Sequence, residues 1–263
     1  MASYVVTGAA RGIGLEYVAQ LSADANNTVF ALVRNKATAT RLESLPGNLP
    51  GNNITILEAD VTDPKALENA AKAVSGVTGG KLDYLINNAA LVKIGGPGLT
   101  QFTNPDDLEK ELLDYFRTNT VGTVHCINAF LPLLQMGSVK KVITITTGGA
   151  DTEFVLKAKH MGSAGYSISK AAVNMVVAKY AAQFKSEGFV FLALSPGFVD
   201  TSTLKAAPET VKGISKTLTQ ITPAFKGAMT PQQSVKLQLE VIYRWTVEDT
   251  GAFVSHHGNK AWL

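Results

Sequence analysis

The sequence lacks the features that mark secreted, membrane and nucleic-acid-binding proteins. Its 263 residues include one cysteine, Cys126, which excludes an internal disulfide and indicates a reducing compartment, where this thiol is expected to lie inert in the core. No basic segment precedes an apolar run at the N-terminus, and no uncharged apolar stretch reaches the roughly 18 residues of a membrane span. The 24 Lys and Arg residues are dispersed and the net charge is only +3. We therefore expect a cytoplasmic protein that binds neither membranes nor nucleic acid.

Metal-binding side chains are also sparse. The 4 histidines include the adjacent His256 and His257, but none is spaced with cysteine or acidic residues as metal ligands are. We expect no metal site. With 46% hydrophobic and 17% charged residues, the chain has the composition of one large globular domain. A chain of this length buries about three quarters of its unfolded surface, so it needs no disulfide or metal to fold.

Short apolar runs alternate with longer helical segments along the chain. The predicted strands are 4–6, 28–33, 54–57, 82–86, 141–146 and 190–194, and the predicted helices are 13–21, 65–74, 105–134 and one that carries Tyr166. This order predicts a single α/β domain over 1–263, a Rossmann-type doubly wound parallel sheet with helices on both faces. Loops are expected at 46–53, 91–104, 148–164 and 201–230. The last three are too long for simple connections, and we expect them to enclose a substrate.

The first predicted strand runs directly into a glycine-rich turn. Gly8, Gly12 and Gly14 stand where the strand passes into a helix. Glycines at such a turn let the backbone approach a ligand and leave the N-terminal amides of the helix facing a phosphate. The spacing GxxxGxG only approximates the general fingerprint GxGxxG, and a plain strand-to-helix turn is the alternative. The place of the turn after the first strand of a βαβ unit favours dinucleotide binding.

The end of the second predicted strand indicates which dinucleotide is bound. In this fold, an acidic residue there suits a ribose 2′-hydroxyl, whereas an arginine suits a 2′-phosphate. The strand is followed by Arg34 and Asn35, and no acidic residue occurs between Asp24 and Glu43. Arg11 of the glycine turn could approach the same phosphate from the other side. This favours NADP(H) over NAD(H), with a solvated arginine at a strand end as the alternative.

The segment YSISK at 166–170 places Tyr166 and Lys170 four residues apart on a helix, which brings them to the same face. A phenol titrates near pH ~10, and a fixed neighbouring cation favours the phenolate, so such a pair suits proton transfer. The spacing also occurs by chance. The alternative is an ordinary helix in which the tyrosine packs inward and the lysine extends to solvent.

Taken together, six motifs resemble those of the short-chain dehydrogenase/reductase family. They occur in the family's order and cover nearly the whole chain. They are the TGxxxGIG-like loop 7–14, the acidic-hydrophobic pair Asp60 and Val61, the NNAG-like segment 87–90, the helical Asn119, the YxxxK segment 166–170 and the PG-x-V-x-T-like turn 196–201. The ending 251–262 also looks like the family's last strand and its closing G…W.

The resemblance implies a cofactor-binding role for each matching residue. Gly8, Arg11, Gly12, Ile13 and Gly14 would hold the pyrophosphate, Asp60 and Val61 the adenine, Asn88 and Ala89 the adenosine ribose and middle of the cofactor, and Pro196, Gly197, Val199 and Thr201 the nicotinamide end. These residues join Arg34 and Asn35, the positions expected to distinguish NADP(H) from NAD(H).

The resemblance also implies catalytic roles. Tyr166 would donate a proton to the substrate carbonyl oxygen as hydride arrives at carbon, and Lys170 would lower the pKa of the tyrosine and hold the nicotinamide ribose. Asn119 would anchor a proton-relay water. In this arrangement the cofactor carries the hydride chemistry, and the protein supplies orientation and the proton.

One position departs from the family pattern. Where the family has a serine that steadies the substrate oxygen, this sequence has Thr147, which keeps a hydroxyl and adds a methyl group. The segment 148–164 between Thr147 and Tyr166 contains an insertion. We favour Thr147 for the hydroxyl because such donors belong on rigid elements. Ser163 and Thr152 are the alternatives.

The resemblance implies a nicotinamide-dependent oxidoreductase that reduces a ketone or aldehyde, or oxidises the corresponding alcohol, and Arg34 favours NADP(H) as its cofactor. The stretch 204–229 is rich in Ala, Thr, Leu and Ile, which weakly favours a large apolar substrate. One alternative is a member of specialised biosynthesis that acts on an imine, enone or polyketide. Another is a catalytically silent cofactor-binding regulatory protein, against which the intact Asn119, Tyr166 and Lys170 argue. The family resemblance also suggests a homodimer or homotetramer joined through long helices.

Overall fold

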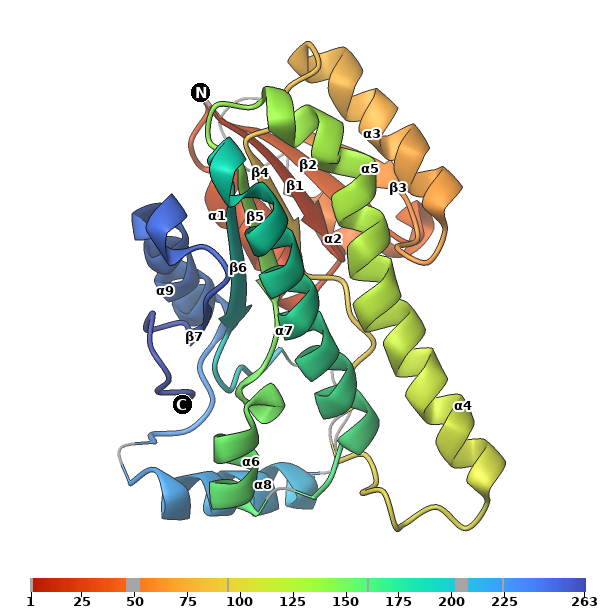
Figure 1. The fold of residues 1–263 in the computed structure, drawn as a ribbon, viewed down its shortest axis with the longest axis vertical. Coiled ribbons are helices and arrows are strands. Elements are labelled where there is room, and N and C mark those ends of the chain that lie inside the picture. The colour runs from red at the N-terminus through yellow and green to blue at the C-terminus, as the bar shows by residue number, and fades with distance from the viewer. Residues whose placement is uncertain (1, 46–52, 94, 160, 202–207, 224) are drawn as a thin grey trace.

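The central element is a parallel sheet of seven strands (Figure 1). A computed structural model describes residues 2–45, 53–93, 95–159, 161–201, 208–223 and 225–263. The strands are β1 Ser3–Thr7, β2 Thr28–Val33, β3 Ile54–Glu58, β4 Tyr84–Asn87, β5 Lys141–Ile145, β6 Val190–Ser195 and β7 Phe253–Ser255. Their order, β3-β2-β1-β4-β5-β6-β7, confirms the predicted doubly wound fold. The order reverses between β1 and β4, where sheets of this kind open a crevice for ligands.

Helices cover both faces of the sheet. They are α1 Gly12–Ser22, α2 Thr40–Glu43, α3 Pro64–Thr78, α4 Pro105–Tyr115, α5 Gly122–Met136, α6 Thr152–Ala158, α7 Ala164–Phe184, α8 Pro208–Ile221 and α9 Pro231–Arg244. Successive residues of β1 point to opposite layers, as the pleat of a strand requires. Tyr4 and Val6 belong to the apolar cluster that includes α1 and α9, whereas Val5 belongs to the cluster that includes α3, α5 and α7. Cys126 lies in the second cluster, where burial raises the pKa of its thiol to about 12.

The helix predicted over 105–134 is continuous but not uniform. Asn104 begins it, because its side chain accepts a hydrogen bond from the amide of Asp106, and Pro105 occupies the first helical position. Between α4 and α5 the chain widens into a π-helical turn, Phe116–Val121. Such turns are rare and are found frequently at functional sites. Here the turn carries Asn119.

Two of the predicted loops contain helices. The segment 148–164 forms a short 3-10 turn, Gly148–Ala150, and then α6, which begins where the Asp151 carboxylate accepts a hydrogen bond of 2.8 Å from Phe154 N. The segment 201–230 contains α8. Both helices lie side by side beyond the carboxyl ends of the strands (Figure 1). Most of the predicted loop 46–53, and part of the apolar stretch 204–229, lie outside the described residues.

The last long helix, α9, was not among the predicted elements. It begins with a capping box, in which Thr230 Oγ1 accepts from Gln233 N at 3.2 Å and Gln233 Oε1 accepts from Thr230 N at 3.0 Å. Pro231 fills the first helical position. No helix in the described parts of the chain has the length and apolarity needed to cross a membrane.

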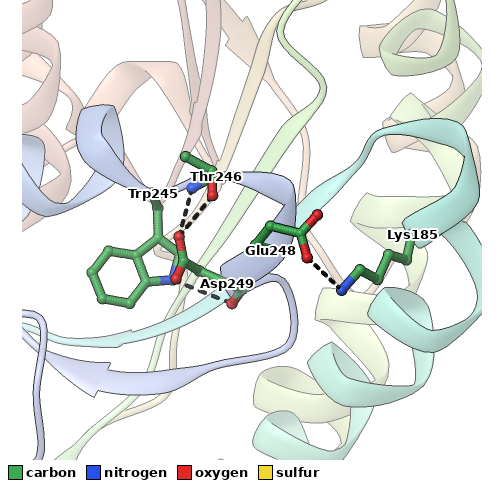
Figure 2. A network of polar contacts seen from close by, with 5 residues as sticks. All are labelled: Lys185, Trp245, Thr246, Glu248 and Asp249. Carbon is green, nitrogen blue, oxygen red and sulfur yellow. Dashed lines mark hydrogen bonds and ion pairs between the residues drawn. The ribbon is translucent and has the colours of Figure 1, made fainter.

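A small polar network holds the turn between α9 and β7 (Figure 2). Asp249 Oδ2 accepts hydrogen bonds from Thr246 N at 3.0 Å and Thr246 Oγ1 at 2.9 Å, which lower the pKa of that carboxyl. Trp245 Nε1 donates to the Asp249 carbonyl at 3.3 Å, and an exposed ion pair joins Lys185 to Glu248. Because the network precedes β7, it lies at the amino end of that strand, opposite the crevice.

Candidate active site

The glycine turn after β1 has the shape that dinucleotide binding requires. Gly8 and Gly12 have φ of +66° and +57°, in the left-handed region that favours glycine. A Cβ on Gly8 would lie 2.8 Å from Ala89 Cα, and one on Gly14 would lie 2.3 Å from the Gly8 carbonyl oxygen. Backbone atoms cannot move aside at these distances. Glycine is therefore required at Gly8 and Gly14 for the turn to pack against Ala89 and against itself, and the binding of a pyrophosphate at the N-terminus of α1 stays a prediction.

Asn88 lies behind this turn and supports it. Its Nδ2 donates to the carbonyls of Thr7 at 3.0 Å and Gly8 at 3.2 Å, which uses both hydrogens of the amide. Thr7 Oγ1 in turn accepts from the amides of Asn88 and Ala89, both at 3.0 Å. The amide nitrogen of Asn88 is thus fully used by the protein backbone, and the predicted contact of Asn88 with the cofactor ribose stays a prediction. The residue joins the turns that follow β1 and β4.

The predicted adenine corner follows β3. Asp60 Oδ1 accepts from Thr62 N and Thr62 Oγ1, both at 2.8 Å, which fixes the direction of the carboxylate. Val61 is buried against Gly122, where an added Cβ would lie 2.9 Å from Val61 Cγ2. Asp60 and Val61 therefore have fixed positions just after the edge strand β3, and their contact with an adenine stays a prediction.

The turn after β2, where a 2′-phosphate is predicted to bind, contacts a carboxylate from a distant part of the sequence. Arg34 is exposed after β2, and the Asn35 side chain accepts from Ala37 N at 2.8 Å to begin a short 3-10 turn, Lys36–Thr38. Glu58, at the end of β3, accepts from Lys36 N at 2.8 Å. Strand pairing brings it there, because Val33 and Glu58 are register partners. Its carboxylate is bound to the backbone of the turn that follows Arg34.

The Tyr166 and Lys170 pair opens α7. Lys170 is 2% exposed, and its Nζ donates to the Ile145 carbonyl at 2.7 Å. Burial lowers the pKa of Lys170 from 10.5 to about 8. Burial also raises the pKa of Tyr166, with a smaller contribution from Tyr115, whose ring centroid lies 6.2 Å away.

These shifts differ from the prediction that Lys170 lowers the pKa of Tyr166. Desolvation is the main cause of the raised pKa of Tyr166, and the ammonium of Lys170 donates to a backbone carbonyl of β5. A phenol with a raised pKa keeps its proton at neutral pH. Without a bound ligand, Tyr166 is therefore in the protonated form that a proton donor needs.

Asn119 connects the loop after β4 to the second turn of α7. Its Oδ1 accepts from Leu91 N at 2.7 Å, and its Nδ2 donates to the Leu91 carbonyl at 3.1 Å and to Ser169 Oγ at 2.9 Å. Ser169 Oγ donates to the Tyr166 carbonyl at 2.7 Å. Both amide hydrogens of Asn119 are thus committed to the protein. The predicted anchoring of a relay water would fall to its main-chain carbonyl, which accepts from Thr123 Oγ1 at 2.7 Å and has a second lone pair.

Thr147 stands at the end of β5, next to the start of α7. Its Oγ1 accepts from Gly149 N at 3.1 Å, so its own hydrogen is available to a ligand. A Cβ on Gly149 would lie 3.5 Å from Thr147 Oγ1 and 3.3 Å from Ser167 Oγ, which shows that Thr147 and the residue after Tyr166 converge.

The alternative hydroxyls are placed differently. Ser163 Oγ lies 3.4 Å from the Lys93 carbonyl, to which it donates, and Thr152 is exposed at the start of α6. The neighbouring Thr146 points to the other side and donates to Asn174 Oδ1 at 2.8 Å. The local geometry therefore favours Thr147 for the hydroxyl predicted beside Tyr166.

The turn after β6 is clamped between two segments. Gly197 has φ of +80°, and a Cβ there would lie 2.5 Å from Met229 Cε and 2.7 Å from His256 Cε1. Val199 pairs with Met229 in an isolated bridge, Met229 N donates to the Phe198 carbonyl, and Asp200 N donates to the Met229 carbonyl, both at 2.9 Å. The family motif predicted Pro196, Gly197, Val199 and Thr201, but nothing in it indicated these partners from the segment before α9 and from the end of β7.

Comparisons with known proteins identify the family of this chain. The family profile described as short chain dehydrogenase matches residues 3–212. Short chain dehydrogenase virK of Hypocrea virens is 43% identical and short-chain dehydrogenase/reductase AacuF of Aspergillus aculeatus is 44% identical, each over 100% of both chains. The crystal structure of NADPH-bound carbonyl reductase from chicken fatty liver is 29% identical, with a TM-score of 0.79 over 98% of both chains. The chain belongs to the short-chain dehydrogenase/reductase family, whose members are oxidoreductases that use a nicotinamide cofactor.

Proposed function

We propose that this chain is an NADP(H)-dependent reductase of a ketone or aldehyde, with Tyr166 as the proton donor. The observation that carries the proposal is the pair at the start of α7, in which Lys170 is buried with its Nζ 2.7 Å from the Ile145 carbonyl and Tyr166 lies half-buried one helical turn before it. A purely cofactor-binding protein has no chemical need for Asn119, Tyr166 and Lys170 together.

Different residues of the chain bind the cofactor, orient the substrate and transfer the proton. The nicotinamide supplies a hydride when it is bound. The glycine turn and the turn 196–201 hold the two ends of the cofactor, and Thr147 donates a hydrogen bond to the substrate carbonyl oxygen. Tyr166 gives its proton to that oxygen, while Lys170, whose ammonium donates to the Ile145 carbonyl, keeps positive charge close to the cofactor ribose. Because Tyr166 is protonated at neutral pH, reduction is favoured there, and alcohol oxidation increases as the pH rises.

The preference for the phosphorylated cofactor rests on the corner after β2. Arg34 is exposed there, and the nearby carboxylate of Glu58 already accepts a hydrogen bond from Lys36 N. The related carbonyl reductase from chicken fatty liver was solved with NADPH bound. Arg34 and Arg11 supply forked donors suited to a 2′-phosphate.

An apolar substrate is supported by the residues around the insertion. Leu99, Leu156 and Met161 are large apolar side chains with 52%, 79% and 82% of their surface exposed. The main chain joins their segments, because Ser163 N donates to the Gly96 carbonyl at 2.7 Å and Ala164 N to the Pro97 carbonyl at 3.2 Å. We infer that these side chains line the approach to Tyr166 and favour ketones with apolar substituents.

A homo-oligomer through α4 and α7 is also proposed. Ile168 and Met175 on α7 are 47% and 60% exposed, and Leu113 and Phe116 on the neighbouring helix are 58% and 44% exposed. Val173 and Val177 on the same helix are buried in the core and are not available to a partner. Sedimentation of the purified chain tests the proposal, and Met175→Glu should shift it toward the monomer.

An absorbance assay at the nicotinamide band tests the enzymatic proposal. The purified chain is mixed with NADPH or NADH and with aldehydes, ketones and quinones of increasing apolar size. We expect consumption of NADPH with at least one apolar ketone. Arg34→Ala should weaken NADPH binding about tenfold and leave NADH binding nearly unchanged. Cofactor binding without turnover of any substrate would favour the regulatory alternative, and equal losses for both cofactors would contradict the preference for NADPH.

A further inference from the structure

A chain of buried hydrogen bonds runs from α1 through α9 to the turn after β6. Tyr17 OH donates to Gln238 Oε1 at 2.8 Å, Gln238 Nε2 donates to Ser234 Oγ at 2.9 Å, and Ser234 Oγ donates to the Pro196 carbonyl at 2.7 Å. All three of these residues, Tyr17, Ser234 and Gln238, are 0% exposed. Buried polar groups connected in this way hold a single arrangement, because any break leaves a donor or acceptor unpaired away from water.

The Pro196 carbonyl determines which group donates and which accepts in each of these hydrogen bonds. A carbonyl can only accept, so Ser234 must donate its hydrogen to Pro196 and accept from the nitrogen of Gln238. The amide oxygen of Gln238 then faces Tyr17, which must donate. Burial raises the pKa of Tyr17 well above its ordinary value, which keeps this donor hydrogen in place. Reversing the amide of Gln238 would break two bonds at once.

The two ends of this chain lie at the two ends of the crevice. Tyr17 is in the second turn of α1, whose first turn follows Gly8 and faces the predicted pyrophosphate. Pro196 begins the turn that is predicted to grip the nicotinamide. Ser234 and Gln238 are one helical turn apart on α9, and Ser234 N also donates to the Thr230 carbonyl at 3.1 Å. The helix thus links two turns that the cofactor must contact simultaneously.

We propose that Ser234 and Gln238 are positioning residues, which hold the nicotinamide-binding turn at a set distance from the glycine turn. This inference rests on the proposed binding of NADP(H). Met229 already attaches Phe198 and Asp200 through its backbone, but no described contact of Met229 reaches the carbonyl of Pro196. Ser234 makes that contact. Loss of its hydroxyl should release the start of the turn while leaving the rest attached.

A role in positioning and a role in stability alone predict different results for two ligands. Adenosine 2′,5′-bisphosphate contains the adenosine half of NADPH and lacks the nicotinamide. If Ser234 acts on the turn after β6, its loss affects NADPH and spares the bisphosphate. If these hydrogen bonds only stabilise the fold, the affinities for both ligands change together or neither changes.

Ser234→Ala in the full chain tests the proposal by calorimetry with both ligands. We expect the Kd of NADPH to rise about tenfold, and the Kd of the bisphosphate to stay within about twofold. Ser22→Ala is the matched control, since Ser22 is also 0% exposed and donates to the Ala19 carbonyl within its own helix at 3.3 Å. This control should leave both affinities unchanged. Ser234→Thr, which keeps the hydroxyl, should restore the affinity for NADPH.

Three other results would contradict either the positioning role of Ser234 and Gln238 or the proposed function. An unchanged ratio of the two Kd values in Ser234→Ala would show that these hydrogen bonds only stabilise the fold. If that variant does not fold, Gln238→Met is measured in the same way, because it keeps the bond from Ser234 to Pro196 but removes the bond that orients Ser234. A normal ratio in that variant would also contradict the proposal. A wild-type chain that binds neither ligand would instead contradict the proposed function itself.

Discussion

Two groups of polar residues in the crevice use their atoms differently. The frame group consists of Thr7, Asn88 and Asn119, and the amide hydrogens of both asparagines are all donated to other groups of the protein. The reactive group consists of Thr147, Tyr166 and Lys170, in which burial shifts the pKa of the phenol and of the amine. The family motifs contain members of both groups without distinguishing them. We infer that substitutions in the frame group change stability and cofactor affinity, whereas those in the reactive group change turnover.

The largest expected effect belongs to Tyr166→Phe. Removing the phenol hydroxyl should lower carbonyl turnover by about a thousandfold, within the range of general acid catalysis. Cofactor affinity should change little, since the ring remains. Steady-state assays and calorimetry measure the two quantities. Tyr180→Phe is the control on the same helix, where the hydroxyl donates to Asn128 Oδ1. Substantial turnover in Tyr166→Phe would remove Tyr166 from the reactive group.

A smaller loss of turnover is expected for Thr147→Val, which has nearly the same shape but no hydroxyl. Loss of one donor to a developing oxyanion costs about a hundredfold in turnover. Thr147→Ser should keep most of the activity, and Ser163→Ala and Thr152→Val should keep nearly all of it. If Ser163→Ala lost turnover and Thr147→Val did not, the alternative assignment would be correct.

The lysine of the reactive group should make stability depend on pH. The folded pKa of Lys170, about 8, lies below its ordinary 10.5, so between these values the unfolded chain binds more protons than the folded one. The free energy of unfolding of the wild type, relative to Lys170→Met, should therefore rise by about 2 kcal/mol between pH 8 and pH 10. Urea unfolding at several pH values measures this, with the exposed Lys65→Met as the control. A flat difference would show that folding does not lower the pKa of Lys170.

The smallest effect, and the one that tests the frame group, is expected for Asn88→Ala. Losing the bonds to the carbonyls of Thr7 and Gly8 should lower the free energy of unfolding by about 1.5 kcal/mol and weaken NADPH binding by a few fold. Turnover at saturating cofactor should stay close to that of the wild type. Asn128→Ala, at an exposed position, serves as the control. A fall in turnover with unchanged affinity would place Asn88 in the reactive group.

Most of the fold could be predicted from sequence, because buried parallel strands are recognisable as short apolar runs between helices. The missed helices had other signals. In α9, Thr230 and Gln233 have the spacing of a capping box around Pro231, which is readable in the sequence. In α6, only seven residues separate Asp151 from Lys159, and the glycines around them resemble a loop. A helix this short depends on packing more than on its own propensity.

The site was predicted by position but not by contact. Sequence motifs indicated that Asn88 and Asn119 lie in the crevice, but the direction of an amide depends on backbone groups far away in the sequence, such as the carbonyl of Leu91. The same limit applies to Glu58, which reaches the turn after β2 only through the register of two strands. The support of the turn at Pro196 depends on Ser234, 38 residues later.

Because Cys126 is buried, the rate at which its thiol is labelled measures how often this part of the fold unfolds. The thiol is 1% exposed in the cluster beneath α5, and burial raises its pKa to about 12, so alkylating reagents meet neither the sulfur nor a thiolate while the fold is intact. With one cysteine in the chain, each labelled molecule records a single opening event of that layer. A ligand that binds only the folded state slows such labelling in proportion to its occupancy. Thiol-labelling kinetics can therefore rank cofactors and candidate substrates without any knowledge of the reaction.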